Sequence, residues 1–356
     1  MADEKRVHRK IDHLHHAVSS HTSADHLFDD LILIHQSLSC YDWDEIDLTG
    51  RFVGREWPVP LYINAVTGGA PEALDVNRFL ARSAAAYGIP MAVGSQTAAL
   101  NDPALMETYS IVRKVNPDGV IWANLGAYAT VAMARQAVSM LQADAIQIHL
   151  NTPQELAMPE GDRHFRGTWE RIGEITSSVG VPVIVKEVGF GLSYETVARL
   201  EGLSIAAYDV GGRGGTNFVA IEQQRTRVSG PFRSWGIPTA VSLVETLDAC
   251  CRDIPVFASG GITDGLVAAK AIALGASAVG LAGVLVKALA RGGEAEVNRV
   301  LRSTIDQLRT AMLLTNARTL NDLRRVPLIL RGDLLTWLAQ RGVDLSQYAQ
   351  RGSIRS

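Results

Sequence analysis

The 356-residue sequence has few cysteines and no block of charge of one sign. Its three cysteines, Cys40, Cys250 and Cys251, form no CxxC motif and no framework that could crosslink a secreted domain. The formal net charge is −3 and no cluster of Lys and Arg compensates for it locally, so no field attracts nucleic acid. We therefore expect a cytoplasmic protein that does not bind nucleic acid.

Long apolar runs are missing as well. No segment reaches the roughly 18 apolar residues that a transmembrane helix needs. The N-terminal stretch MADEKRVHRKIDHLHH lacks the apolar centre of a signal peptide. We expect neither secretion nor a membrane partner. Because 47% of the residues are hydrophobic, the chain can still bury a large core, and its length fits one large α/β domain.

From about Pro60 onward, short apolar runs alternate with segments of helical spacing rich in Ala and Leu. The predicted strands are residues 61–64, 90–94, 119–125, 144–150, 182–188, 205–210, 255–260 and 277–282. Eight such units close into a (β/α)8 TIM barrel. A doubly wound sheet shares the alternation, but eight strands and the lack of an early GxGxxG motif argue against it.

The sequence predicts three parts around this barrel. Residues 1–59 do not follow the alternation and form an N-terminal extension, which contributes to the substrate site. Residues 60–316 form the barrel, in which residues 293–315 are a last amphipathic helix. Residues 317–356 are expected to be short helices packed at the periphery.

Histidines are concentrated near the N-terminus, where seven of the nine fall within the first 35 residues. No cysteine lies among them, and no HExxH motif is present. This favours a solvated or substrate-facing segment over a zinc site.

Glycine-rich and polar segments follow the predicted strands, at the end of a barrel where active sites lie. The segments SGGIT (259–263) and GLAGV (280–284) follow the last two strands, and each precedes a helix. Backbone N–H groups in such loops and a helix N-terminus can hold a phosphate. Tight turns would explain a single Gly-Gly pair, but two such loops in the last two units favour a phosphate site.

Lys186 ends the fifth predicted strand and points into the barrel mouth if the alternation of side chains holds. A lysine there is rarely structural, because burial of an unpaired ammonium costs several kcal/mol. Beside a flavin, it would supply positive charge near N1 and C2=O. The alternative is an ion pair with Glu187, which the alternation disfavours.

The segment HLNTPQE gathers His149, Asn151, Gln154 and Glu155 at one strand end. Glu155 is a suitable oxygen ligand for Mg²⁺ in a site for a polar substrate. The same residues also fit the solvated first turn of a helix. The spacing alone leaves both interpretations open.

The motifs RKIDH, NAVTGG, GSQ, HLNTPQE, PEGDR, VIVKEVG, GGRGGTNF, WGIPTAVSL and ASGGI, taken in order from Arg9 to Leu314, resemble the FMN-dependent type 2 isopentenyl-diphosphate isomerases. HLNTPQE with GGRGGTNF is the most specific combination. The resemblance implies reversible conversion of isopentenyl diphosphate to dimethylallyl diphosphate in isoprenoid biosynthesis. It also implies reduced FMN, Mg²⁺, NAD(P)H as the reductant, and a homo-oligomer, either a tetramer or an octamer.

The resemblance further implies roles for single residues. Flavin contacts are implied for Ala65, Val66, Thr67, Ser95, Asn124, Lys186 and Thr216, and contacts to its phosphate for Gly261, Ile262, Thr263, Ala282 and Gly283. Substrate contacts are implied for Arg9, Lys10, Ser95 and Gln154, catalytic roles for Gln154, His149 and Asn151, and Mg²⁺ ligation for Glu155. Reduced FMN itself would move the proton.

The chain departs from the family pattern at three places. Thr97 stands where an arginine usually helps to bind diphosphate, Val66 replaces a usual Met, and Asn316 stands in a usual Thr-Gly pair. A repurposed barrel with a changed substrate is therefore one alternative. An FMN-dependent 2-hydroxy-acid oxidase is another, but Val210 stands where those enzymes carry the histidine base.

Overall fold

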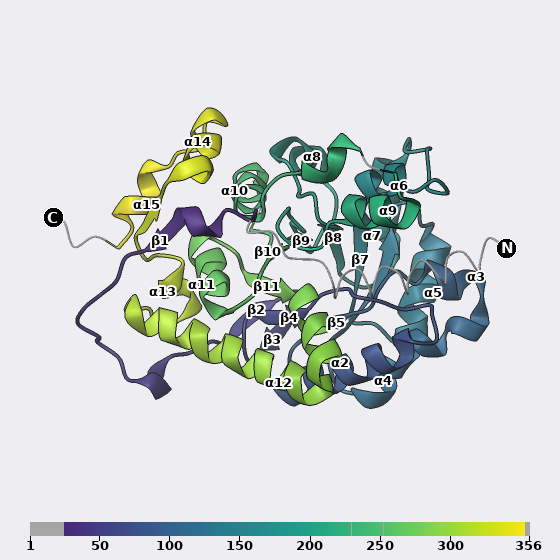
Figure 1. The fold of residues 1–356 in the computed structure, drawn as a ribbon, viewed down its shortest axis with the longest axis horizontal. Helices are drawn as coiled ribbons and strands as arrows, with labels where there is room; N and C mark the ends of the chain where they lie inside the picture. The colour runs from purple at the N-terminus through teal and green to yellow at the C-terminus, as the bar shows by residue number, and fades with distance from the viewer. Residues whose placement is uncertain (1–24, 229, 252, 353–356) are drawn as a thin grey trace.

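The computed structural model describes residues 25–228, 230–251 and 253–352. Eight parallel strands form a closed barrel in the order β10-β11-β4-β5-β6-β7-β8-β9. Figure 1 shows the barrel strands with helices around them. The strands are β4 (Leu61–Ile63), β5 (Met91–Ala92), β6 (Ile121–Gly126), β7 (Ala145–Leu150), β8 (Val183–Glu187), β9 (Ala207–Asp209), β10 (Val256–Ser259) and β11 (Ala278–Leu281). Seven fall within the predicted strands and β6 extends one residue beyond its predicted end at 125, so the predicted (β/α)8 barrel is confirmed.

Helices surround the barrel and follow its strands in the chain. They are α2 (Ala73–Tyr87), α3 (Thr97–Asn101), α4 (Glu107–Val115), α5 (Val131–Leu141), α6 (Thr152–Ala157), α7 (Thr168–Ser178), α8 (Tyr194–Leu200), α9 (Phe218–Thr226), α10 (Thr239–Ala249), α11 (Gly265–Leu274) and α12 (Gly283–Leu314). Short 3₁₀ turns lie at η1 (Phe28–Asp30), η2 (Trp43–Glu45), η3 (Pro103–Leu105) and η4 (Pro231–Ser234). The backbone of α12 leaves the helical conformation at Gly292 and Gly293, and the helix predicted over residues 293–315 begins at this kink.

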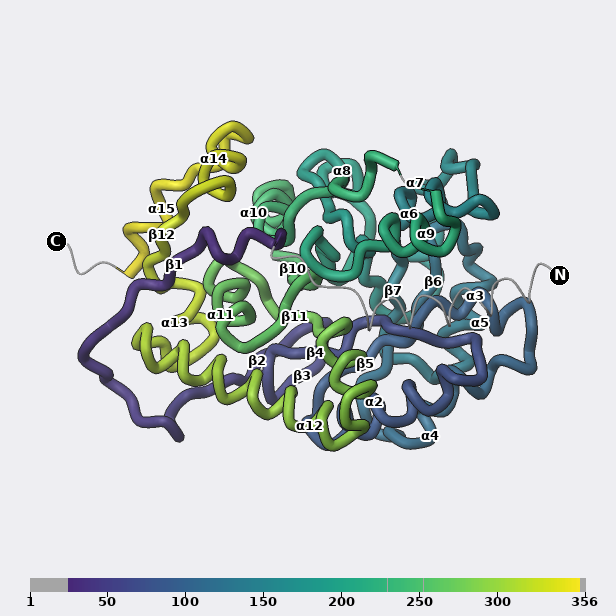
Figure 2. The backbone as a smooth tube through the Cα atoms, in the orientation of Figure 1, coloured from purple at the N-terminus to yellow at the C-terminus, as the bar shows by residue number. Residues whose placement is uncertain are grey.

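The segments on either side of the barrel pair with each other. β1 (Leu31–Leu33) runs antiparallel to β12 (Leu328–Leu330), and Figure 2 shows the early and late parts of the chain side by side there. The C-terminal segment was predicted to be helical throughout, which is wrong for β12. Helices α13 (Leu320–Leu323), α14 (Gly332–Gln340) and α15 (Ser346–Gln350) agree with the prediction. The boundaries of the three predicted parts stay a prediction.

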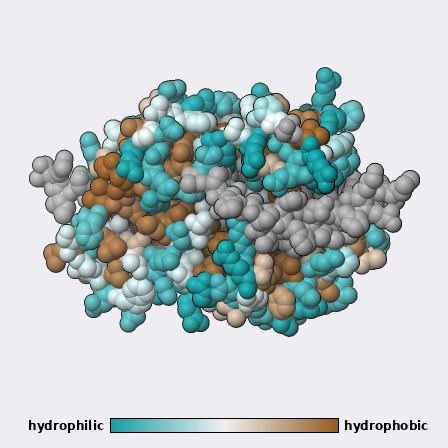
Figure 3. All heavy atoms as spheres, in the orientation of Figure 1, coloured by the Kyte–Doolittle hydropathy of each residue, from teal (hydrophilic) through white to brown (hydrophobic). Residues whose placement is uncertain are grey.

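The pair of strands outside the barrel also carries exposed apolar side chains. Ile32 and Ile329 face each other across β1 and β12, and each is about two-fifths exposed. Figure 3 shows hydrophobic residues gathered on that side of the visible face. None of the helices in the described part of the chain combines the length and the apolar composition that a membrane span requires.

Aromatic rings close the N-terminal end of the barrel. The hairpin of β2 (Gly50–Phe52) and β3 (Arg55–Trp57) directly precedes β4 and brings Trp57 under the barrel. The ring of Trp57 lies 5.7 Å from that of Trp122 on β6 and 5.7 Å from that of Phe257 on β10. Trp122 and Phe257 stack with their planes 3° apart. Polar residues and glycines line the opposite, C-terminal end of the barrel.

We expect Trp122→Ala to lower the free energy of unfolding by about 3–5 kcal/mol, because it removes a fully buried ring from this packed layer. The measurement is urea unfolding followed by circular dichroism. Trp235→Ala is the control, since that side chain is 60% exposed and its loss should change stability by roughly 0.5 kcal/mol or less. Equal effects of the two substitutions would contradict the assigned packing.

Candidate active site

A cleft of about 580 Å³ lies at the C-terminal ends of the barrel strands. Every described residue that the sequence analysis assigned to the site lines it. These residues are Ala65, Val66, Thr67, Ser95, Asn124, His149, Asn151, Gln154, Glu155, Lys186, Thr216, Gly261, Ile262, Thr263, Ala282 and Gly283. The two remaining assignments, Arg9 and Lys10, lie outside the described residues. The structure therefore brings the described residues together in one cleft, while that cleft's role as the active site and the role of each residue stay predictions.

Two glycine loops after β10 and β11 meet at one wall of the cleft. Gly260 and Gly261 have φ values of 102° and 83°, in the left-handed region that favours glycine. A Cβ on Gly260 would lie 2.1 Å from the carbonyl oxygen of Gly212, so no larger side chain fits there. At Gly283 the nearest atom to an added Cβ is the hydroxyl oxygen of Thr216, 3.8 Å away. The wall is close-packed at its base and more open at the start of α12.

The helices behind these loops differ in how their first N–H groups are used. At α11, the carboxylate of Asp264 accepts hydrogen bonds from the N–H groups of Leu266 and Val267, each at 3.0 Å. At α12, the N-cap residue is Ala282, which has no side chain that could cap. The sequence analysis treated both helix N-termini as phosphate-binding. The phosphate role of both stays a prediction, but α11 differs from α12 because its first N–H groups already bind a carboxylate.

Lys186 points into the cleft from the end of β8, as the alternation of side chains predicted. Its side chain is buried, and its Nζ donates a 2.8 Å hydrogen bond to the main-chain carbonyl oxygen of Glu187. Among the described residues that line the cleft, it is the only lysine or arginine. Lys186 is thus the main fixed positive charge that this part of the chain offers to an anionic ligand.

The carboxyl group of Glu187 has hydrogen-bond partners other than the ammonium group of Lys186. It accepts hydrogen bonds from the N–H groups of Phe190 and Gly191. Burial raises the pKa of Glu187 to about 8, although these N–H groups and Lys186 act in the opposite direction. The raised pKa favours the uncharged form of this carboxyl beside the ammonium of Lys186.

The loop after β7 holds Glu155 at the mouth of the cleft. One carboxylate oxygen of Glu155 accepts from the side chain of Asn151 at 2.8 Å, and the other accepts from the N–H of Asp162 at 2.9 Å. Arg163 fixes the loop by donating to the main-chain oxygens of Glu155 and Met158, at 2.6 and 2.8 Å. The segment does begin a helix, α6, yet these contacts also turn its carboxylate into the cleft. The helix start is therefore confirmed, while the metal and polar-substrate role of HLNTPQE stays a prediction.

Ser95 and Thr97 line the side of the cleft formed by the loop after β5. Their hydroxyl oxygens lie 3.1 Å apart, within hydrogen-bond distance. Thr97 offers a hydroxyl where the family pattern has a cation, and no arginine of the described lining takes its place. A diphosphate in this cleft would meet hydroxyls and N–H groups on this side and carboxylates near Glu155.

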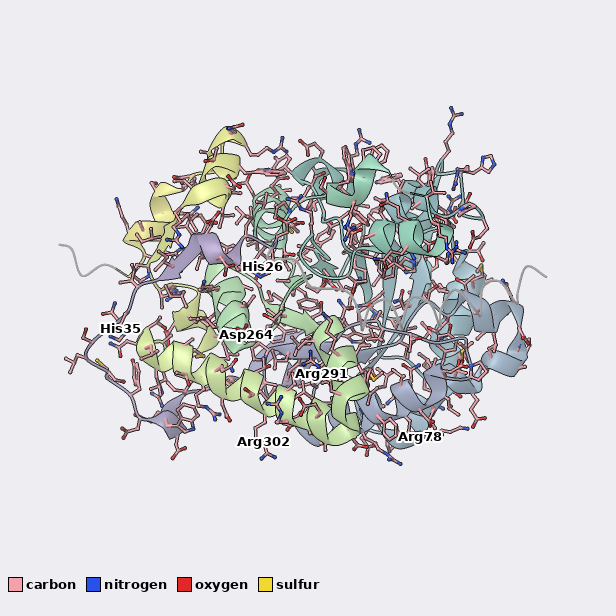
Figure 4. The ribbon with its side chains drawn as sticks, in the orientation of Figure 1. His26, His35, Arg78, Asp264, Arg291 and Arg302 are labelled. Carbon is pink, nitrogen blue, oxygen red and sulfur yellow. The ribbon has the colours of Figure 1, made fainter. Side chains whose placement is uncertain are left out.

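Of the seven N-terminal histidines predicted to lie in a solvated or substrate-facing segment, five lie outside the described residues, His35 is exposed and His26 is buried. The Nδ1 of His26 accepts a 3.0 Å hydrogen bond from the N–H of Phe28. The ring packs so closely on the glycine loop that a Cβ on Gly261 would lie 2.9 Å from it. Burial lowers the pKa of His26, which favours the neutral ring. Figure 4 shows His26 near Asp264, at the start of α11.

Sequence reasoning missed several polar groups of the site. Tyr128, Glu160 and Asp162 line the cleft without having been singled out, although the last two belong to the motif PEGDR. Below the cleft, the buried carboxylate of Asp209 accepts from Ser259 at 2.6 Å and from Asn64 at 2.8 Å. In the sequence, the polar residues at the ends of β4, β9 and β10 could have predicted this network.

Comparison with known proteins agrees with this geometry. Residues 127–329 match the family model described as FMN-dependent dehydrogenase. The chain is 46% identical over 348 residues to an isopentenyl-diphosphate delta-isomerase of Bacillus licheniformis, covering 97% of this chain and 99% of that protein. It is also 46% identical over 327 residues to the enzyme of the same name from Symbiobacterium thermophilum, covering 91% and 90%.

Solved structures show the same fold at greater distance. A mandelate oxidase variant with an FMN adduct superposes with a TM-score of 0.65 at 20% identity, covering 88% of this chain and 93% of that one. The identity is low enough that this likeness concerns the fold alone. The full-length similarity to the isomerases is much higher, and the chain therefore belongs to the family of isopentenyl-diphosphate delta-isomerases.

Proposed function

We propose that this protein interconverts isopentenyl diphosphate and dimethylallyl diphosphate, with reduced FMN as the bound cofactor. The proposal rests mainly on the composition of the cleft in a chain that belongs to this family. The cleft brings the polar side chains of HLNTPQE together with Lys186 and the glycine loops. The substrate is inferred from the names of the relatives. The cleft contains the groups that such a substrate and FMN would need.

The described residues fit FMN. The loop residues 260–263 and the start of α12 present N–H groups for its phosphate, and Lys186 would lie beside its ring. Glycine at position 94 lets two further loops approach, since a Cβ there would lie 2.7 Å from the carbonyl oxygen of Thr67. When bound in its reduced form, FMN supplies the acid and base chemistry for moving a proton at an unactivated alkene.

The remaining side chains would position the substrate. Gln154 lines the cleft beside Glu155, where its amide would lie against the isoprenyl carbons. Glu155 would bind Mg²⁺, whose charge would offset the carboxylates near the diphosphate. His149 and Asn151 would complete the polar wall of the reacting part of the cleft. NAD(P)H as the reductant, a tetramer or octamer, and a cytoplasmic location belong to the same proposal.

A hydroxy-acid oxidase is disfavoured by the same cleft. Val210, which stands where those enzymes carry a histidine base, is fully buried and cannot take a proton. The retention of Gln154 and Glu155 in the cleft also argues against a barrel that has lost its activity.

The test is an anaerobic assay of the purified protein with FMN, NADPH, Mg²⁺ and isopentenyl diphosphate. We expect dimethylallyl diphosphate to form only when the flavin is reduced, and Thr97 to be tolerated. The same mixture with oxidised FMN is the control. Bound and reducible FMN without any product would refute the isomerase and point to a changed substrate at Thr97.

We expect Lys186→Ala to weaken FMN binding by about tenfold or more, because a hydrogen bond to a charged group contributes about 1.5–3 kcal/mol. The reduction potential of the remaining bound FMN should fall, since an anionic reduced ring loses a positive neighbour. Flavin fluorescence titration and redox titration measure the two effects. Lys114→Ala is the control, because that ammonium pairs with Glu107 on the surface. Unchanged affinity and potential would exclude Lys186 from the flavin site.

Glu155→Gln should raise the Mg²⁺ concentration needed for half-maximal activity by about tenfold, which corresponds to about 1.4 kcal/mol. The amide also puts a donor against Asn151 or the N–H of Asp162, which loosens the loop. FMN content, read from the absorbance spectrum, should not change. Glu170→Gln on the exposed first turn of α7 is the control. A colourless variant without FMN would contradict a metal role.

A further inference from the structure

A chain of buried hydrogen bonds leads from helix α5 to His149 in the cleft. It runs from the main-chain oxygen of Ala137 through Gln96 and Asn124 to the imidazole. Gln96 is fully buried and Asn124 is almost fully buried, so water does not compete for these contacts. The direction of each hydrogen bond therefore follows from the main-chain groups in the chain, because an N–H can only donate and a carbonyl oxygen can only accept.

The orientation of the Gln96 amide follows from its two main-chain partners. Its Nε2 lies 3.0 Å from the carbonyl oxygen of Ala137, which can only accept. Its Oε1 lies 2.9 Å from the main-chain N–H of Asn124, which can only donate. A flipped amide would face both partners with the wrong atom, so Gln96 has one orientation.

Asn124 is constrained in the same way. Its Nδ2 lies 3.0 Å from the carbonyl oxygen of Val93, an acceptor without a hydrogen. A flipped side chain would put two oxygens in contact there. The Oδ1 of Asn124 therefore faces His149, whose Nδ1 is 2.8 Å away. Because an amide oxygen can only accept, Nδ1 of His149 carries a hydrogen whether the ring is neutral or charged.

The other ring nitrogen lies toward Gly126, which lines the cleft and pairs with His149 across β6 and β7. A Cβ on Gly126 would lie 3.3 Å from Nε2 of His149, closer than most side-chain contacts allow. The glycine therefore keeps space beside Nε2 on the cleft side. This observation is independent of the hydrogen bonds to Nδ1.

We propose that Asn124 is a positioning residue that fixes His149 in the tautomer with its hydrogen on Nδ1. Any proton or hydrogen bond that His149 exchanges with a bound ligand then passes through Nε2. The part that Nε2 plays toward an isoprenyl diphosphate rests on the proposed function, whereas the tautomer rests on the protein contacts alone.

Nitrogen NMR of the FMN-loaded protein, labelled with ¹⁵N in its histidines, tests the tautomer directly. Loss of one set of ring signals in His149→Gln assigns the residue. At a pH where this ring is neutral, we expect its Nδ1 to show the shift of a protonated nitrogen and its Nε2 that of an unprotonated one. The reverse pattern in the wild-type protein would overturn the proposal, even if no variant folded.

Two variants then test the role of Asn124. Asn124→Ala should lose the pure Nδ1–H pattern, because it removes the acceptor. Asn124→Asp should restore it, because a carboxylate oxygen also accepts from Nδ1, but it should lower stability, because its second oxygen meets the carbonyl oxygen of Val93 where Nδ2 now donates. Asn321→Ala on the exposed start of α13 is the matched control. An unchanged pattern in Asn124→Ala would refute the positioning role. These spectra do not depend on turnover, so a failed isomerase assay would leave the tautomer test intact.

Discussion

Closure of the barrel by the pairing of β11 with β4 determines where every functional group can lie. Gly280 stands opposite Tyr62 in this pair, and an added Cβ would lie 2.5 Å from the Tyr62 ring, so glycine makes room for the aromatic end of the barrel. Because the closed strands are all parallel, their C-terminal ends share one rim. One end is packed with rings and the other is free to bind ligands.

At that rim, the groups available to an anion are mainly backbone N–H groups. The glycine loop 260–263 and the uncapped start of α12 provide N–H groups, and Lys186 adds one buried charge. Backbone groups are already held in place by the strands, so little entropy is lost when they bind. The Glu155 loop is held differently, because Arg163 donates hydrogen bonds to its main-chain oxygens.

The strands and the gathering of these residues in one cleft were predictable from the alternation of strands and helices along the sequence. In a barrel, this alternation places the C-terminal ends of all strands at one rim. Lys186 illustrates this, since its place at the end of an apolar run was enough to aim it into the cleft. Lateral neighbours were not predictable. The contact of Asn124 with His149 needs the register of β6 against β7, and the capping of α11 by Asp264 needs the actual turn. The pairing of β1 with β12 was missed because strands of three residues carry almost no periodic signal.

That last pairing bears on how the chain is made. Leu31 lies opposite Leu330, so β1 finds its partner only after almost the whole polypeptide has left the ribosome. The barrel strands, in contrast, end at Leu281 and can close earlier. During synthesis Leu31, which is fully buried in the complete fold, has no strand partner until β12 emerges. We therefore expect the two-stranded sheet to form after the barrel strands have been synthesised.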